Sequence, residues 1–139
     1  MIPITIEEVE YLAFQLAKKH MEWDEPIPDF STRFPGLLES CLANAFQTYA
    51  KKELYPTLLD KAAIIFYQMI KNHPFVNGNK RIAVTTLLTF LFLNHKWLEV
   101  DNEQLCRFAV WVAESESQLK RGVTIAIRDF VQKNLRDLQ

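Results

Sequence analysis

The feature that most constrains this fold is an almost continuous apolar run from Ile82 to Leu93, which follows directly on a turn. The turn contains Pro74, Asn77 and Gly78, which favour bends over regular structure. Nothing in the run alternates between polar and apolar residues as a half-exposed strand would. We therefore expect a helix that is buried on most of its sides and begins just after the turn.

The start of this expected helix carries residues suited to binding an anion. The first turn of a helix leaves backbone N–H groups without partners, and the helix dipole adds positive potential there. Lys80 and Arg81 add positive charge, and the amides of Asn77 and Asn79 can bind a ligand or cap the helix. Cations at this end oppose the dipole by about 0.3–1 kcal/mol each, so a bound phosphate explains them better than stability does.

His73 lies just ahead of the turn. Histidine is the side chain best suited to accept a proton from a hydroxyl group near neutral pH. A proton acceptor beside a phosphate-binding site suggests transfer of a phosphate group. The alternative is an ordinary loop histidine beside solvated Lys80 and Arg81, because isolated motifs are weak signals.

The run His73-Pro-Phe-Val-Asn-Gly-Asn-Lys-Arg81 resembles the signature of the Fic/Doc superfamily, and its Asn-Lys-Arg ending resembles the death-on-curing (Doc) branch. Pro35 to Ser40 and Phe90 to Asn94 are similar to two further stretches of Doc-like proteins. The resemblance implies one domain over residues 1–139, an all-α helical bundle of the Fic/Doc type with a central buried helix after the signature loop.

The resemblance also implies a reaction. In this superfamily the signature histidine, here His73, deprotonates a hydroxyl side chain of a target protein, which then attacks a phosphate of ATP. Lys80 and Arg81 would be catalytic beside it. ATP and Mg²⁺ would be held by the loop and helix start, which comprise Asn77, Gly78, Asn79, Lys80 and Arg81.

Position 80 separates two versions of this chemistry. Fic enzymes usually have glycine there and transfer AMP, whereas the Doc branch has lysine and transfers the γ-phosphate to elongation factor Tu. A long cationic side chain occupies space that glycine leaves open to the α- and β-phosphates. Lys80 therefore favours a kinase, and an adenylyltransferase (AMPylation) is the alternative.

One position departs from the family pattern. The acidic residue that the family uses for magnesium is Asn77 here. An amide oxygen can bind magnesium but carries no charge, and hard divalent cations favour carboxylates. We expect weakened metal binding, and a further alternative follows: a catalytically weakened nucleotide-binding or regulatory module with the Fido fold.

The resemblance to Doc implies a type II toxin–antitoxin system, in which a small antitoxin folds a helix onto an apolar groove of the toxin near the first helix and the active site. No glutamate in the chain precedes glycine or asparagine, so the inhibitory motif of many Fic proteins is absent. By similarity, the flap that docks the target would fall near Lys51, Lys52 and Glu53. A solvated turn is the alternative there, and the residues alone favour it.

Charge and hydropathy exclude several classes of protein. A formal net charge of −1 argues against DNA binding by the chain itself. The run from Ile82 to Leu93 is too short to span a bilayer, and no amino-terminal stretch resembles a secretion signal. We therefore expect a cytoplasmic protein without membrane contact, in which Cys41 and Cys106 are buried thiols.

Helical spacing and caps predict the remaining elements. The central helix should end at Asn94, with this residue in the left-handed conformation. Phe75 should anchor the signature loop, and Trp23 and Phe30 the irregular connection before the second helix. The other predicted helices are Ile6 to His20 after a Thr5–Glu8 capping box, Leu37 to about Tyr49, Thr57 to Lys71, one starting at Asp101, and a last one broken or weakened at Gly122. In the first of these, helical spacing predicts a core face made of Val9, Leu12, Ala13, Leu16 and Ala17.

Overall fold

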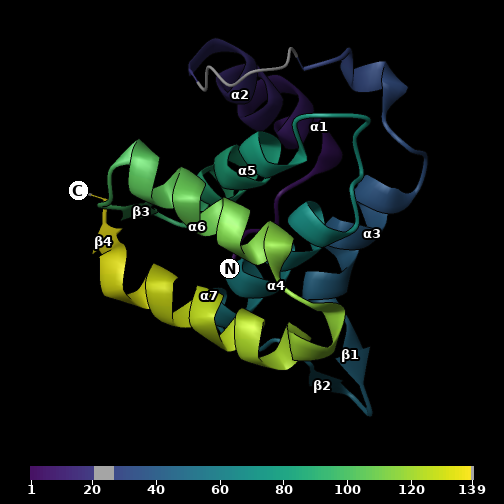
Figure 1. Ribbon diagram of the computed structural model, residues 1–139. Helices are drawn as coiled ribbons and strands as arrows, with labels where there is room; N and C mark the ends of the chain where they lie inside the picture. Colours follow the sequence, from purple (N-terminus) through teal and green to yellow (C-terminus); the bar gives the residue numbers. More distant parts are fainter. Residues whose placement is uncertain (21–26, 139) are drawn as a thin grey trace.

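The computed structural model describes residues 1–20 and 27–138, so the predicted role of Trp23 lies outside the described residues (Figure 1). The fold is all-α, as predicted, with only short strand pairs beside the helices. The helices are α1 (Ile6–Glu8), α2 (Phe14–His20), α3 (Leu37–Ala43), α4 (Leu58–Lys71), α5 (Asn79–Leu93), α6 (Asn102–Glu114) and α7 (Lys120–Asn134). The strands are β1 (Thr48–Tyr49), β2 (Lys52–Glu53), β3 (Lys96–Leu98) and β4 (Leu135–Asp137).

The centre of the molecule is α5, the helix predicted from the apolar run. It packs against α2, α4, α6 and β3, and α4 in turn packs against α7 (Figure 1). Ile82, Phe90 and Leu91 are fully buried, whereas Phe92 is 55% exposed. Burial around most of the circumference explains why the run lacks an amphipathic pattern.

Local caps start the helices where the sequence predicts. Thr5 and Glu8 form a complete capping box ahead of α1, and Thr57 and Asp60 form one ahead of α4. The side chain of Asp101 accepts a hydrogen bond from the Gln104 backbone N–H at the start of α6. Each cap satisfies N–H groups that the first turn leaves without helical partners.

The first helix contains a π-helical turn, Val9–Ala13, between α1 and α2. The Phe14 N–H donates to the Val9 carbonyl, and this wider turn shifts the buried face. Of the predicted core residues, Val9, Ala13 and Ala17 are buried. The prediction was wrong for Leu12 and Leu16, which are 43% and 41% exposed, and Phe14 is buried in their place.

The second predicted helix ends early. It stops at Ala43, passes through a 3-10 turn (Asn44–Phe46) and enters the antiparallel β1–β2 hairpin, so the prediction of helix to Tyr49 was wrong. The hairpin turn consists of Ala50 and Lys51, whose φ angles are +52° and +66°. Paired positive φ values suit the right-handed twist of a hairpin but are rarely signalled by such residues.

Two predictions about helix ends also need correction. Helix α7 runs unbroken through Gly122, because the glycine is exposed and its backbone has ordinary helical geometry. Asn94 ends α5 as predicted, but its φ is −104°; the left-handed residue is the next one, His95, at +63°. The Asn94 side chain instead exchanges two hydrogen bonds with the backbone of Ile2.

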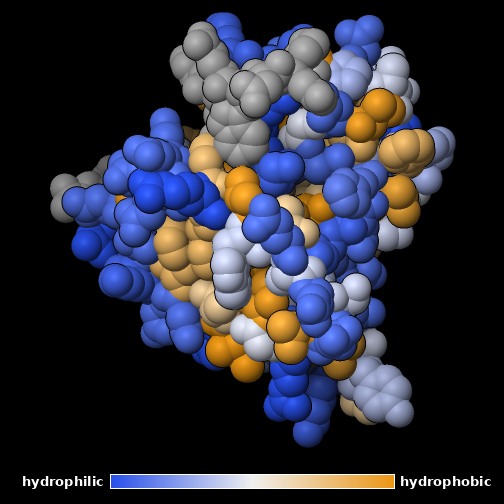
Figure 2. Space-filling model, viewed as in Figure 1, coloured by the Kyte–Doolittle hydropathy of each residue, from blue (hydrophilic) through white to orange (hydrophobic). Residues whose placement is uncertain are grey.

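The carboxyl-terminal helices complete the bundle. The β3 and β4 strands pair antiparallel and tie the end of α7 to the end of α5. Figure 2 shows hydrophobic side chains gathered over α6 and α7. On these helices Phe108 stacks on Phe130 with ring centroids 4.2 Å apart, and Trp111 is 48% exposed.

Both cysteines are free thiols, as predicted, and neither forms a disulfide. Cys41 is fully buried on α3, but Cys106 on α6 is only half-buried. Among the described residues, no helix is long and apolar enough to cross a membrane.

Candidate active site at the start of α5

The start of α5 is built on Gly78, which occupies the N-cap position with φ +78°. A Cβ atom at this residue would lie 2.8 Å from Cγ1 of Ile27, so both the backbone angle and the packing require glycine. Asn79 begins the helix, which places Lys80 and Arg81 in its first turn. The predicted juxtaposition of two cations with the amino terminus of a buried helix is therefore present.

The signature loop is held by one side chain of the helix, that of Asn79. Its Oδ1 accepts the Phe75 backbone N–H, and its Nδ2 donates to the Phe75 carbonyl, both at 2.9 Å. These two bonds fold the loop back onto the first residue of α5.

The buried ring of Phe75 anchors the signature loop to the core, as predicted. Its side chain is 3% exposed, and its ring centroid lies 5.8 Å from that of Phe14 and 5.7 Å from that of Phe30. Phe30 is also buried, which confirms its predicted role in pinning the connection before α3. A loop fixed by buried aromatic rings limits the small displacements that would degrade a catalytic geometry.

His73 lies at the mouth of this loop, with its side chain exposed. Its Nδ1 is 3.4 Å from Nδ2 of Asn79, so the imidazole and the helix start are directly connected. The next residue, Pro74, accepts a hydrogen bond of 2.9 Å from the Phe34 N–H, which ties the loop to the segment before α3. His73 has φ +50°, an uncommon conformation for a residue with a side chain.

The cations of the site differ in burial. Arg81 is 5% exposed and is held within the fold, whereas Lys80 is half-buried and closer to solvent. The structure thus brings together His73, Asn77, Gly78, Asn79, Lys80 and Arg81 over one loop and one helical turn.

The residues present do not form a usual magnesium site. Oδ1 of Asn77 accepts the Gly78 N–H at 2.8 Å, so this oxygen is turned towards the backbone. The described residues contain no group of three or more histidine, cysteine or acidic side chains placed to hold a metal ion. We therefore assign magnesium no step of the chemistry.

Lys51, Lys52 and Glu53 are not brought to the loop. They form the turn and second strand of the β1–β2 hairpin, which precedes α4, whereas His73 follows it. Because α4 has 14 residues, its ends are separated by about 21 Å. Target docking at the hairpin stays a prediction.

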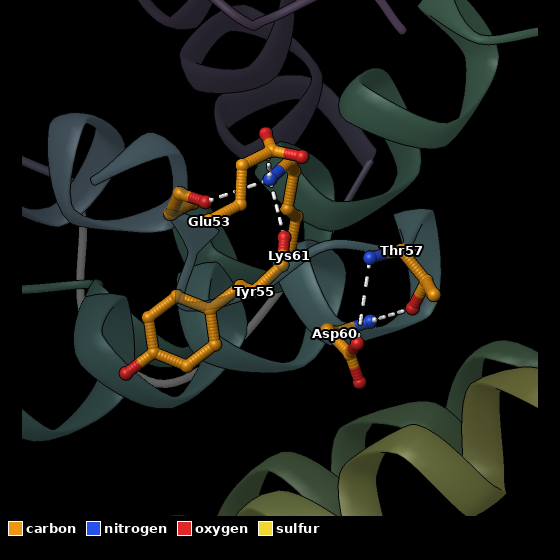
Figure 3. Close-up of polar contacts among 6 residues, drawn as sticks. Glu53, Tyr55, Thr57, Asp60 and Lys61 are labelled. Atoms are coloured by element: carbon orange, nitrogen blue, oxygen red, sulfur yellow. Dashed lines mark hydrogen bonds and ion pairs between the residues drawn. The ribbon is translucent and has the colours of Figure 1, made fainter. Parts of the chain in front are cut away.

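The hairpin is held by a buried lysine that the sequence did not reveal as special (Figure 3). Lys61 is 1% exposed, and its Nζ donates to Oε1 of Glu53 at 3.1 Å and to the carbonyls of Ala45 and Tyr55. Its ammonium group also lies over the Phe46 ring. Lys61 therefore fixes the hairpin to α4 through a charge-assisted network.

Two residues near the site were also missed, Ile27 over Gly78 and Phe34 beside Pro74. Neither carries a local signal, because each acts through contacts with residues about forty or more positions away in sequence. Homologous sequences would be the natural source of such a signal.

Comparisons with known proteins identify the family of the chain. A model of the Fic/DOC family matches residues 3–91, which include the entire loop from His73 to Arg81. Toxin Doc of Mycolicibacterium smegmatis (strain ATCC 700084 / mc(2)155) is 37% identical over 73 residues. That match covers 52% of this chain and 56% of the length of Toxin Doc, and no solved structure matches the chain.

The family match covers well over half of the chain and includes His73 and the cationic start of α5. The similarity to Toxin Doc agrees with the resemblance of the Asn79-Lys80-Arg81 ending to the Doc-like branch. The chain belongs to the Fic/DOC family and is similar to its Doc-like members.

Proposed function

We propose that this protein is a Doc-like toxin of a type II toxin–antitoxin system, acting in the cytoplasm as an ATP-dependent protein kinase. Fic/DOC proteins generally transfer nucleotide-derived groups to proteins, and the similar protein in M. smegmatis is a toxin by name. The observation that carries the proposal is the connection between His73 and the first turn of α5 through Asn79. This contact links a proton acceptor to an anion-binding helix start.

The proposed reaction is an in-line displacement at the γ-phosphorus of ATP. The imidazole of His73 accepts the proton of a target hydroxyl as its oxygen bonds to phosphorus. The bond from phosphorus to the β–γ bridging oxygen breaks, and ADP leaves with that electron pair. Lys80 and Arg81 neutralise charge on the phosphates, which supplies most of the catalysis in such reactions.

Lys80 is the reason for proposing γ-phosphate transfer rather than AMP transfer. Its half-buried side chain rises from the second position of α5, where Fic enzymes usually have glycine. The chain beyond Cβ occupies volume at the helix start, so the α- and β-phosphates have less room there. Elongation factor Tu, the target in the Doc branch, is the first candidate substrate.

Transfer of label from ATP tests this proposal. Wild-type protein is incubated with a bacterial lysate and ATP labelled at either the γ- or the α-position. We expect γ-label on a protein band, no α-label, and loss of the signal in His73→Ala. His95→Ala is the matched control, because His95 lies at the opposite end of α5. Transfer of α-label would identify an adenylyltransferase instead.

Asn77 supports a second candidate, a nucleotide-binding regulatory module without efficient transfer. Its amide oxygen faces the Gly78 N–H, and the site lacks the usual carboxylate. Binding of ATP without transfer of either label would favour this candidate. Asn77→Asp keeps an acceptor for the Gly78 N–H and adds a charge, so an increase in magnesium-dependent transfer would show an attenuated enzyme.

The proposed antitoxin would dock by an amphipathic helix. One apolar groove, of about 430 Å³, lies between residues 3–6 and α3 with the 3-10 turn that follows it, and Leu42 of α3 and Phe46 of the turn contribute to its lining. It borders the start of the first helix, but the signature loop does not line it. Co-expression with the neighbouring open reading frame should yield a stable complex; its absence would count against the toxin assignment.

A further inference from the structure

The orientation of the Asn79 amide is determined by its contacts with a single residue. Oδ1 faces the Phe75 N–H and Nδ2 faces the Phe75 carbonyl, both at 2.9 Å. A half-turn of the amide would set donor against donor and acceptor against acceptor. Only one assignment of the oxygen and nitrogen therefore satisfies the backbone of Phe75.

This orientation has a consequence for His73. An amide nitrogen carries two hydrogens and cannot accept a hydrogen bond. One hydrogen of Asn79 Nδ2 goes to the Phe75 carbonyl, and the other is available to Nδ1 of His73, 3.4 Å away. Nδ1 must then present its lone pair, and in a neutral imidazole the proton resides on Nε2.

We propose that Asn79 is a positioning residue that holds neutral His73 in the tautomer protonated at Nε2. The only lone pair of the resting ring then faces Asn79, and Nε2 is a hydrogen-bond donor. The catalytic consequence rests on the proposed function. For Nε2 to accept the proton of a target hydroxyl, it must first release its own proton to water while Nδ1 takes one from water.

This exchange leaves the charge of the ring unchanged and requires the His73 ring to turn so that Nδ1 no longer faces the Asn79 hydrogen, because the two bonds to Phe75 hold the planar amide in place. A phosphate oxygen bound at the start of α5 is a stronger acceptor for that hydrogen than the imidazole, because it is charged. Nucleotide binding would thereby favour the tautomer that is basic at Nε2. The resting enzyme is held in the other one.

Nitrogen-15 NMR of histidine-labelled, nucleotide-free protein tests the proposal, because protonated and unprotonated ring nitrogens have distinct shifts and couplings. His73 is assigned by its loss in His73→Ala, and exposed His95 is the internal reference. We expect a larger Nε2–H fraction at His73 than at His95. In Asn79→Asp the carboxylate accepts from Nδ1–H, so the dominant tautomer should reverse.

An unchanged tautomer in Asn79→Asp, or a wild-type ring protonated at Nδ1, would overturn the proposal. If Asn79→Asp does not fold, Asn79→Ala should lower the Nε2–H fraction of His73 to that of His95, and no decrease would overturn it equally. Lys80→Ala is the matched control and should leave the tautomer unchanged. The spectra need no ATP or target, so this result and the label-transfer result can fail independently.

Discussion

Two separate features require glycine at position 78: its positive φ angle and the lack of space for a Cβ atom. A Cβ atom would meet Cγ1 of Ile27 at 2.8 Å, whereas Gly36, with a similar φ of +83°, has nothing within 4 Å of that position. We predict that Gly36→Ala lowers the free energy of unfolding by about 1 kcal/mol and Gly78→Ala by about 2–4 kcal/mol. Urea denaturation measures both free energies of unfolding. Equal decreases in the two variants would show that the Ile27 side chain moves aside without cost.

His73 is held in the left-handed region, at φ +50°. Asparagine tolerates this region, and a β-branched residue does not. His73→Asn and His73→Val should both abolish transfer. His73→Val should also lower the free energy of unfolding by about 1–2 kcal/mol relative to His73→Asn. Equal stability of the two variants would mean that the loop relaxes without its native backbone.

Because of Cys41, the free energy of unfolding should depend on pH in the alkaline range. Burial raises the pKa of its thiol from 9.0 to about 11, against a smaller lowering effect from a hydrogen bond with Asn72. The folded state therefore keeps the proton longer than the unfolded state, and stability falls as pH rises from about 9 to about 11.

Between pH 8 and pH 10.5 we expect wild-type protein to lose about 2 kcal/mol more than Cys41→Ala, which lacks the titrating group. Unfolding by urea at the two pH values gives the difference. An equal loss in the two proteins would mean that the thiol ionises in the folded state as easily as in the unfolded one.

At the scale of single elements, Gly122 offers a clean test of helix propensity. It lies in the first turn of α7, exposed, with nothing within 4 Å of a would-be Cβ. Gly122→Ala should raise the free energy of unfolding by about 0.5–1 kcal/mol, because alanine loses less backbone entropy on folding. Thermal unfolding would detect it, and destabilisation would argue against a continuous α7.

Elements that depend on adjacent residues could be predicted, and those that depend on distant contacts could not. The caps at Thr5, Thr57 and Asp101 act over three residues, so the local sequence pattern predicts them. The β1–β2 hairpin lacks the usual turn residues and is stabilised by Lys61, a residue of α4. Propensity alone favoured a longer α3, and tertiary contacts overrode it.

For the molecule as a whole, the same division applies to the site. His73, Phe75 and Asn79 interact within seven consecutive residues, so the loop and its helix start were predictable. The cover provided by Ile27 and the tie from Phe34 arise only from the fold. Predicting docking at residues 51–53 relied on resemblance alone, and the structure sets those residues at the far end of α4.

The central claim is that binding and proton acceptance are divided between the helix start and His73. It is tested most directly by measuring, on the same samples, the Kd for ATP and the rate of γ-phosphate transfer. We predict that His73→Ala binds ATP within about twofold of wild type and transfers at least 100-fold more slowly, while Lys80→Ala weakens binding. Transfer at the wild-type rate by His73→Ala would contradict the account.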